Sequence, residues 1–170
     1  GEVAILSATS TATNQNTWIE NMKKVMTEPK YAKLKLVKVA YGDDLRDKSV
    51  AETEALLQTY PNLKVIVAPT TVGIAAAAKV VMDKKLAGKV FVTGLGLPSE
   101  MAAYMGKDGS SPAMYLWNPI DIGYLAGYTA KAMVEGKATG KVGDSFEVGR
   151  LGKRTVTKAN DGGTEVVLGS

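Results

Sequence analysis

The sequence predicts an α/β fold in which helices flank an open parallel sheet and a small antiparallel tail follows. Short runs of β-branched and apolar residues alternate with segments of helical periodicity, a pattern typical of parallel α/β proteins. The chain has 170 residues, enough for one domain with a buried core. Glycines within residues 140–143 interrupt the alternation. Only short extended runs follow this break, and these predict the antiparallel tail.

Five runs are predicted to form the parallel sheet, because each is short, rich in apolar or β-branched residues, and bounded by polar or turn residues. They are residues 3–6, 35–41, 65–68, 89–93 and 113–116. Three further runs, at residues 146–148, 154–157 and 166–168, are expected to pair in the antiparallel tail. A turn is predicted at residues 160–163, where Asn, Asp and Gly residues occur together.

Helical periodicity predicts three helices between the first four strands. In the first helix, apolar residues recur at helical spacing over residues 18–26. The second contains a Ser-x-x-Glu motif of the capping-box form at residues 49–52 and runs to about Tyr60. The third begins near Thr71 and is expected to end near Gly88, which would serve as its C′ glycine.

Two more helices are predicted in the second half of the chain. A short one covers residues 98–105, and a longer one covers residues 119–136. Asn118 directly precedes Pro119, and this pair offers an N-cap side chain followed by a proline at the first helical position. The longer helix is therefore expected to begin at Pro119.

The composition excludes several classes of function. With no Cys and no His, the chain cannot form a disulfide, a thiolate nucleophile, a Ser-His-Asp triad or the usual zinc and haem sites. Its apolar runs are shorter than the roughly 20 residues that span a bilayer. The 21 Lys and Arg and the 17 Asp and Glu give a formal charge of +4, spread along the chain. We therefore predict no nucleic-acid partner.

The loops that leave the strands are the candidate binding segments, because an open parallel sheet binds ligands at the carboxyl ends of its strands. The loop over residues 7–15 is rich in polar side chains and leads directly into a helix N-terminus, where free N–H groups converge. Asn14 and Gln15 are its strongest candidates for binding a ligand. The alternative is that Thr13 or Asn14 simply caps the helix.

Two other strand ends carry neutral polar groups. Thr70 and Thr71 follow Pro69 at the end of the third strand, although Thr71 alone could be a bare N-cap. Trp117 and Asn118 place an aromatic ring beside an amide, which suits a sugar ring, although Trp117 could equally be a core residue. These strand ends contain no catalytic acid and base, so the pattern predicts a binding cleft for an uncharged polyol.

Three other motifs do not predict a cofactor or metal. The glycines at residues 94–96 fail the dinucleotide pattern because its third glycine would fall on Ser99, and residues 106–110 lack the spacing of a phosphate-binding loop. Asp43, Asp44 and Asp47 could bind a cation, but they precede a helix whose dipole they favour. We therefore predict no catalytic residues, no cofactor and no metal site.

Four segments resemble the periplasmic sugar-binding proteins of bacterial ABC importers. They are residues 10–18 (STATNQNTW), 66–78 (IVAPTTVGIAAAA), 92–97 (VTGLGL) and 116–123 (LWNPIDIG). The similarity covers most of the chain and is greatest to the rhamnose-binding proteins, followed by the autoinducer-2-binding proteins. It implies a hinged, two-lobed protein that is not an enzyme, lies in the periplasm or on the outer side of the membrane, closes on a small carbohydrate and delivers it to a membrane permease.

Transferred by position, the resemblance implies a set of ligand contacts. These are Asn14, Gln15, Pro69, Thr70, Thr71, Trp117 and Asn118, with Gly96 as a weaker match. Asn14 stands where autoinducer-2 binders have Asp, which favours rhamnose or a related deoxy sugar. The alternatives are an autoinducer-2 receptor of the same fold and a sugar-modifying α/β enzyme with a carboxylate or Lys as base. A sugar-responsive repressor core shares the fold but would need a helix-turn-helix region.

The resemblance also implies a division of the chain. Residues 1–117 would form the second, C-terminal lobe, and residues 118–170 the hinge-crossing helix and tail that pack on a first lobe missing from this chain. The helix over residues 119–136 would then lack its packing partner. We expect its apolar face to dock against a neighbouring molecule, as in a dimer, or to dock abnormally. This face consists of Ile122, Leu125, Thr129 and Met133.

Overall fold

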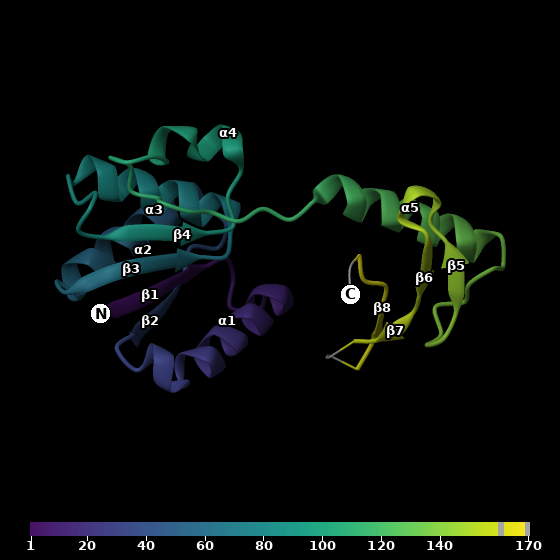
Figure 1. The fold of residues 1–170 in the computed structure, drawn as a ribbon. Helices are drawn as coiled ribbons and strands as arrows, with labels where there is room; N and C mark the ends of the chain where they lie inside the picture. The colour runs from purple at the N-terminus through teal and green to yellow at the C-terminus, as the bar shows by residue number, and fades with distance from the viewer. Residues whose placement is uncertain (160–161, 169–170) are drawn as a thin grey trace. The chain divides into compact units, whose positions relative to one another are not determined.

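The computed structural model describes residues 1–159 and 162–168, which form two compact units (Figure 1). The first unit is Gly1–Leu116, and the second begins at Trp117. In the described part of the chain, no helix is both long and apolar enough to span a membrane.

A four-stranded parallel sheet forms the centre of the first unit, in the order β2-β1-β3-β4. Its strands are β1 (Glu2–Ser7), β2 (Lys35–Tyr41), β3 (Leu63–Ala68) and β4 (Phe91–Gly94). Because all the strands are parallel, their carboxyl ends lie at one edge: Ser7 is in register with Tyr41, and Ala68 with Gly94. The first four strands predicted from the sequence are thereby confirmed.

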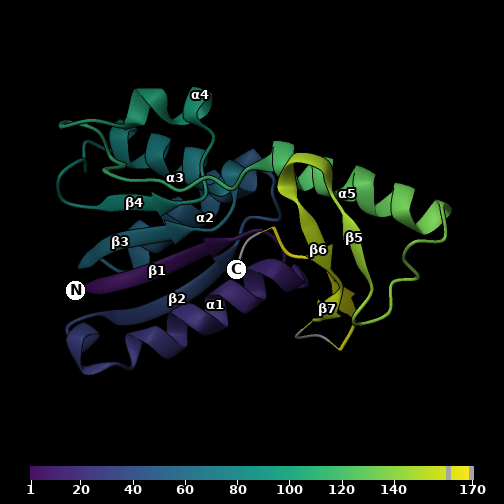
Figure 2. The ribbon, with the colours of Figure 1, turned by 45° about the vertical axis from the view of Figure 1, so that its right-hand side comes forward.

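Helices cover both faces of this sheet. They are α1 (Thr13–Met26), α2 (Arg46–Thr59), α3 (Thr71–Asp83) and the short α4 (Pro98–Met101), which a 3₁₀ turn, Ala102–Tyr104, continues. A second 3₁₀ turn, Pro29–Tyr31, follows α1. The helix α1 lies against one face, and α2 and α3 lie against the other (Figure 1, Figure 2). This is the flanked parallel sheet that the sequence predicts.

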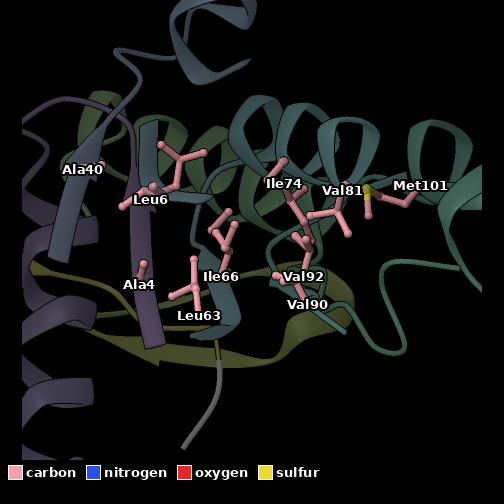
Figure 3. Packing of buried hydrophobic residues seen from close by; sticks show 14 residues of the cluster. Ala4, Leu6, Ala40, Leu63, Ile66, Ile74, Val81, Val90, Val92 and Met101 are labelled. Carbon is pink, nitrogen blue, oxygen red and sulfur yellow. The ribbon is translucent and has the colours of Figure 1, made fainter. Parts of the chain in front are cut away.

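The main core lies between the sheet and α3. Alternate strand residues point to this face because side chains alternate along a strand, so Leu6, Ile66 and Val92 face Ile74 and Val81 of the helix (Figure 3). All five side chains are fully buried. Their packing fixes the start of α3 directly after the end of β3, at the carboxyl edge of the sheet.

The sequence prediction for the end of α3 is wrong. The last helical residue is Asp83, so Gly88 is not its C′ residue. Lys85 occupies the left-handed conformation, with φ of 56°, and the N–H of Leu86 donates to the carbonyl of Val81 at 2.9 Å. This six-to-one bond is the Schellman closure, here with a lysine at the position that glycine usually occupies.

The capping-box motif does not begin α2. The helix starts at Arg46, so Ser49 lies inside it, and Leu45 is the N-cap residue. The Ser49 hydroxyl is buried and has no hydrogen-bond partner among the described residues. The motif therefore lies inside the helix, as the sequence predicts, and the Ser49 N–H donates to the Leu45 carbonyl at 2.9 Å in the first turn.

The run over residues 113–116 does not form the fifth strand of the sheet. Within the described residues it makes one isolated parallel bridge, between Tyr115 and Leu95. The preceding Pro112 has no N–H to donate to a ladder. The first carbonyl of the run instead accepts from the hydroxyl of Thr93 at 2.8 Å. Pairing is therefore confined to a single residue.

In its described residues, the second unit consists of one long helix and two small antiparallel sheets. The helix α5 is Pro119–Val134, the first sheet pairs β5 (Ser145–Glu147) with β6 (Lys153–Thr155), and the second pairs β7 (Thr157–Lys158) with β8 (Thr164–Glu165). A 3₁₀ turn, Gly149–Leu151, connects β5 and β6. The predicted antiparallel tail is confirmed as a class of structure.

The last strand of the tail differs from the sequence prediction, and the predicted turn lies partly outside the described residues. The last strand is Thr164–Glu165 rather than residues 166–168, because the carbonyl of Leu168 accepts from the Arg154 guanidinium at 3.0 Å and not from a strand N–H. Of the predicted turn, Asn160 and Asp161 lie outside the described residues.

The apolar face predicted on α5 is partly covered by the second unit itself. Leu125 is buried against Phe146 and Val156, so this position has a packing partner, contrary to expectation. Ile122 and Met133 remain 41% and 50% exposed. They line an open groove of about 540 Å³ that also includes Thr129 and Val156. The dimer expected through this face stays a prediction.

Candidate functional site

The carboxyl edge of the sheet in the first unit brings together most of the predicted site residues. Asn14 and Gln15 lie in the first turn of α1, just beyond β1. Pro69, Thr70 and Thr71 connect β3 to α3, and Gly96 follows β4. The amides of Asn14 and Gln15 and the hydroxyls of Thr70 and Thr71 therefore share one end of one sheet, where open α/β sheets bind ligands.

Gln15 is held by two hydrogen bonds to the end of β1. Its Oε1 accepts from the Ser7 hydroxyl at 2.6 Å and from the N–H of Ala8 at 2.8 Å. Ser7 is fully buried, and Gln15 is 8% exposed. Both acceptor positions of the carbonyl oxygen are thus occupied, so the amide nitrogen is the group of Gln15 left to bind a ligand.

Asn14 is exposed beside this pair. The N-cap residue of α1 is Ala12, which makes no side-chain cap, so neither Thr13 nor Asn14 caps the helix as the alternative interpretation proposed. A separate hydrogen bond stabilises the preceding loop: the Asn16 amide donates to the carbonyl of Ser10 at 2.8 Å. The Asn14 amide can both donate to and accept from a ligand hydroxyl.

The three residues after β3 differ in their exposure. Pro69 and Thr70 are buried, and Thr71 is partly exposed. The backbone of Thr70 forms the N-cap of α3, but its hydroxyl donates to the Asp44 carboxylate instead of capping the helix. Thr71 is therefore the first helical residue and not a bare N-cap, and its side chain is the accessible hydroxyl of this loop.

The acidic residues before α2 are engaged within the protein. Asp43 forms an ion pair with Lys48, Asp44 accepts from Thr70, and Asp47 lies in the first turn of α2, where it favours the helix dipole. No group of three acidic side chains suited to a metal ion occurs among the described residues.

Glycine is required at the last residue of β4, and a second glycine just beyond the strand is closely packed. At Gly94, with φ of 144°, a Cβ would lie 1.9 Å from the carbonyl oxygen of Ala68. At Gly96 a Cβ would lie 2.8 Å from the Met114 sulfur, and the Gly96 N–H donates to the Tyr115 carbonyl at 2.9 Å. Gly96 therefore shapes the edge by close packing, and its N–H is already used.

Trp117 and Asn118 open the second unit. Asn118 is the N-cap of α5 as predicted: its Oδ1 accepts from the Asp121 N–H at 3.2 Å, and its Nδ2 donates to the Asp121 carboxylate at 2.7 Å. Each group of the amide keeps one further hydrogen-bonding position. Trp117 is 45% exposed, which differs from a core residue.

A charged and aromatic cluster supports the Asn118 cap. The Arg150 guanidinium forms an ion pair with Asp121 and lies 4.7 Å from the centre of the Tyr124 ring. A hydrogen bond from Tyr128 lowers the pKa of Tyr124, and the same bond raises the pKa of Tyr128. The cluster joins the start of α5 to the 3₁₀ turn between β5 and β6.

A separate hollow of about 370 Å³ lies between α1 and the sheet. Its lining is chiefly apolar and includes Val3, Ile5, Val25 and Val67. A polyol needs hydrogen-bonding groups around its hydroxyls, so this hollow does not suit one. The polar edge is the better candidate for binding.

Sequence reasoning missed two residues at this edge, Ser7 and Asp44. Ser7 directly follows an apolar strand run, and a serine there is a weak signal for a buried partner. For Asp44 the sequence indicates a role in the helix dipole or, less simply, in a cation site, and gives no sign of its contact with Thr70. Both act on predicted site residues, Gln15 and Thr70, through contacts that form only once the loops fold.

Solved structures similar to this chain are sugar-transport proteins. One is an ABC transporter solute-binding protein from Clostridium phytofermentas with bound L-rhamnose, with 55% identity, a TM-score of 0.95 and coverage of 100% of this chain and 55% of that one. Another is a sugar ABC transporter from Actinomyces odontolyticus, with 45% identity, a TM-score of 0.76 and coverage of 99% and 53%. The chain spans about half the length of these proteins.

A more distant structure has the same fold. LsrB from Clostridium saccharobutylicum, in complex with AI-2, is 23% identical, with a TM-score of 0.86 and coverage of 99% of this chain and 55% of that one. The family described as periplasmic binding protein domain matches residues 1–138. This chain therefore belongs to the periplasmic binding protein domain family.

Proposed function

We propose that this chain is part of the substrate-binding component of an ABC sugar importer and that it binds rhamnose or a related deoxy sugar. The observation that carries the proposal is the polar edge of the first unit, where Asn14 is exposed and the amide nitrogen of Gln15 is not used in the bonds to Ser7 and Ala8. The protein solved with bound L-rhamnose is 55% identical over the whole of this chain, which supports the choice of sugar.

The chemistry of the edge favours binding without turnover. Its available groups are neutral: the Asn14 amide, the Gln15 amide nitrogen and the Thr71 hydroxyl. The nearest carboxylates, Asp43 and Asp44, are already engaged by Lys48 and Thr70. General acid–base catalysis needs a proton acceptor within reach of the substrate, so a binding protein fits these groups better than a sugar-modifying enzyme.

The proposal assigns different parts of the complete protein to the two units. Residues 1–117 form its second lobe, and residues 118–170 form the connection and tail that pack on a first lobe. In its support, the related transport proteins are about twice as long as this chain, and the groove on α5 leaves Ile122 and Met133 exposed. Trp117 and Asn118 are ligand contacts by the family resemblance, and their part in sugar binding stays a prediction. A membrane permease and a periplasmic or extracellular location follow from the same role.

An autoinducer-2 receptor is the second candidate. Its support is the fold shared with LsrB, whose 23% identity shows fold alone. Asn14 argues for the sugar, because the resemblance gives autoinducer-2 binders an Asp at this position.

The proposal is tested by NMR titration of the chain with L-rhamnose and, separately, with autoinducer-2. Half a cleft binds weakly, so the titration extends to about 50 mM, and Kd is read from the side-chain amide shifts of Asn14, Gln15 and Asn118. We expect saturable shifts with L-rhamnose alone, and recovery of the sugar unchanged. Asn14→Ala should weaken binding about tenfold, through lost hydrogen bonds.

Asn21→Ala is the matched control, because Asn21 lies on the same helix but lines the apolar hollow. It should leave Kd unchanged. Saturable shifts with autoinducer-2 alone would contradict sugar binding and support an autoinducer-2 receptor. An absence of shifts with both ligands, or equal effects of the two Asn variants, would contradict the proposed site.

A further inference from the structure

Ser7 and Gln15 form a buried polar pair where β1 leads into α1. The Ser7 side chain is fully enclosed, and its hydroxyl lies 2.6 Å from Oε1 of Gln15. Buried polar groups are costly unless they are hydrogen-bonded, so a pair of this kind constrains both side chains. The pair lies at the polar edge, next to Asn14.

The two donors at the end of β1 determine which way the Gln15 amide faces. A serine hydroxyl can donate or accept, but the backbone N–H of Ala8 can only donate. With the amide turned over, its nitrogen would meet the Ala8 N–H donor. The observed orientation, with Oε1 2.8 Å from the Ala8 nitrogen, is therefore the one in which both contacts are favourable.

We infer that Ser7 is a positioning residue for the candidate sugar site, where together with the Ala8 N–H it makes Gln15 a pure hydrogen-bond donor toward the ligand. This inference rests on the proposed function. The ligand group opposite Gln15 is then an acceptor, such as a hydroxyl or ring oxygen. A protonated amine has no acceptor, so an amino sugar with its ammonium at this place is rejected.

The adjoining loop does not depend on Ser7 for its shape. The Asn16 amide donates to the Ser10 carbonyl at 2.8 Å, and the Ala12 N–H donates to the Thr9 carbonyl at 3.2 Å. Loss of the Ser7 hydroxyl should therefore release the Gln15 amide more than the backbone around it. This separates a positioning role from a merely structural one.

The first arm of the test needs no ligand. It compares the side-chain NH2 resonances of Gln15 in the original chain, in Ser7→Ala and in Ser110→Ala. Ser110 is a matched control, because it is also fully buried and its hydroxyl donates one hydrogen bond, to the Ala78 carbonyl at 2.9 Å. We expect Ser7→Ala alone to move the Gln15 resonances. Unmoved resonances would overturn the positioning role.

The second arm measures Kd for L-rhamnose. Ser7→Ala should weaken binding about tenfold, Ser110→Ala should leave it unchanged, and Ser7→Thr, which keeps the hydroxyl, should recover much of the loss. Ser7→Cys keeps the size of the side chain and replaces Ser7→Ala where that variant does not fold.

The two arms separate failure of this inference from failure of the proposed function. If the original chain binds L-rhamnose and Ser7→Ala binds it equally well, the positioning role is wrong and the sugar site stands. If the original chain shows no saturable shift, the sugar site is wrong and the role of Ser7 in sugar binding falls with it, whatever the first arm shows of the Gln15 amide.

Discussion

Lys85 ends α3 in a backbone conformation that side chains other than Gly rarely adopt. Its φ of 56° places it in the left-handed region, where a Cβ costs roughly 1–2 kcal/mol. The hydrogen bond from Leu86 to Val81 maintains this geometry in spite of that cost. The sequence predicts Gly88 as the C′ residue, because glycine is the usual residue there. A lysine gives no sequence signal for the end of a helix.

We predict that Lys85→Gly raises the free energy of unfolding by about 1 kcal/mol, because it removes the left-handed strain. Lys84→Gly is the control. Lys84 has an ordinary φ of −81°, so glycine there should lower stability by about 0.5–1 kcal/mol through chain entropy. Urea unfolding measures both variants. Changes of the same sign would contradict the strain argument.

Individual site residues differ in how far the sequence reveals them. Asn14 and Gln15 are predictable from a polar loop that precedes a helix, and Asn118 from its place before Pro119, because these are local patterns. Ser7 is different: its contact with Gln15 spans a loop and depends on how that loop closes. Such a partner becomes visible only when the backbone is placed.

Among the elements, those with strong periodicity were predicted and those that depend on pairing were not. The strands β1 to β4 and the long helices follow from apolar spacing and burial. The runs over residues 113–116 and 166–168 have strand-like composition but do not form the predicted strands. Pairing at those places depends on the partner that each backbone group finds, such as Thr93 or Arg154, which is a long-range property.

The loop between α5 and β5 should be sensitive to acid through Asp144. Its carboxylate accepts from the Thr139 N–H at 2.5 Å, the Thr139 hydroxyl at 2.9 Å and the Lys141 N–H at 3.3 Å. The bonds from Thr139 lower the pKa of Asp144 below its ordinary value. A depressed carboxylate pKa stabilises the fold above the unfolded-state pKa of about 3.9, and this contribution is lost as the pH falls through the folded-state pKa.

We therefore predict that Asp144→Asn lowers the Tm of the second unit at pH 7 and that its difference from the original chain shrinks below about pH 4. Glu147→Gln, at an exposed position of β5, is the control and should leave the Tm nearly unchanged. Circular dichroism melts at several pH values measure this. A difference that is constant with pH would show that the carboxylate charge has no role.

At the scale of the whole molecule, the described residues form two hydrophobic cores with no residue in common. The first contains Leu6, Ile66 and Ile74, and the second contains Leu125 and Phe146. The predicted division of the chain near residue 117 rests on family resemblance alone. Composition and periodicity do not show which helix packs on which core. The assignment of the two parts to lobes stays a proposal.

We predict that the two cores respond separately to substitution. Ile66→Ala and Leu125→Ala should each lower the stability of their own unit by about 2–4 kcal/mol and leave the other unchanged, because each creates a cavity in one core. The chain has two tryptophans, Trp18 in α1 and Trp117 in the second unit. In a Trp117→Phe background, the fluorescence of Trp18 reports unfolding of the first unit. In a Trp18→Phe background, the fluorescence of Trp117 reports unfolding of the second. A shift of both transitions by either substitution would contradict the separation.

Gly94 limits how this sheet edge could be redesigned. Any side chain there would meet the Ala68 carbonyl, so a mutant library that randomises the last residue of β4 would lose its altered members to misfolding. Asn14 is exposed, Thr71 is partly exposed, and neither carries this restriction. Directed evolution toward a new sugar can therefore substitute residues at the helix N-termini, but it can change almost nothing at the end of β4.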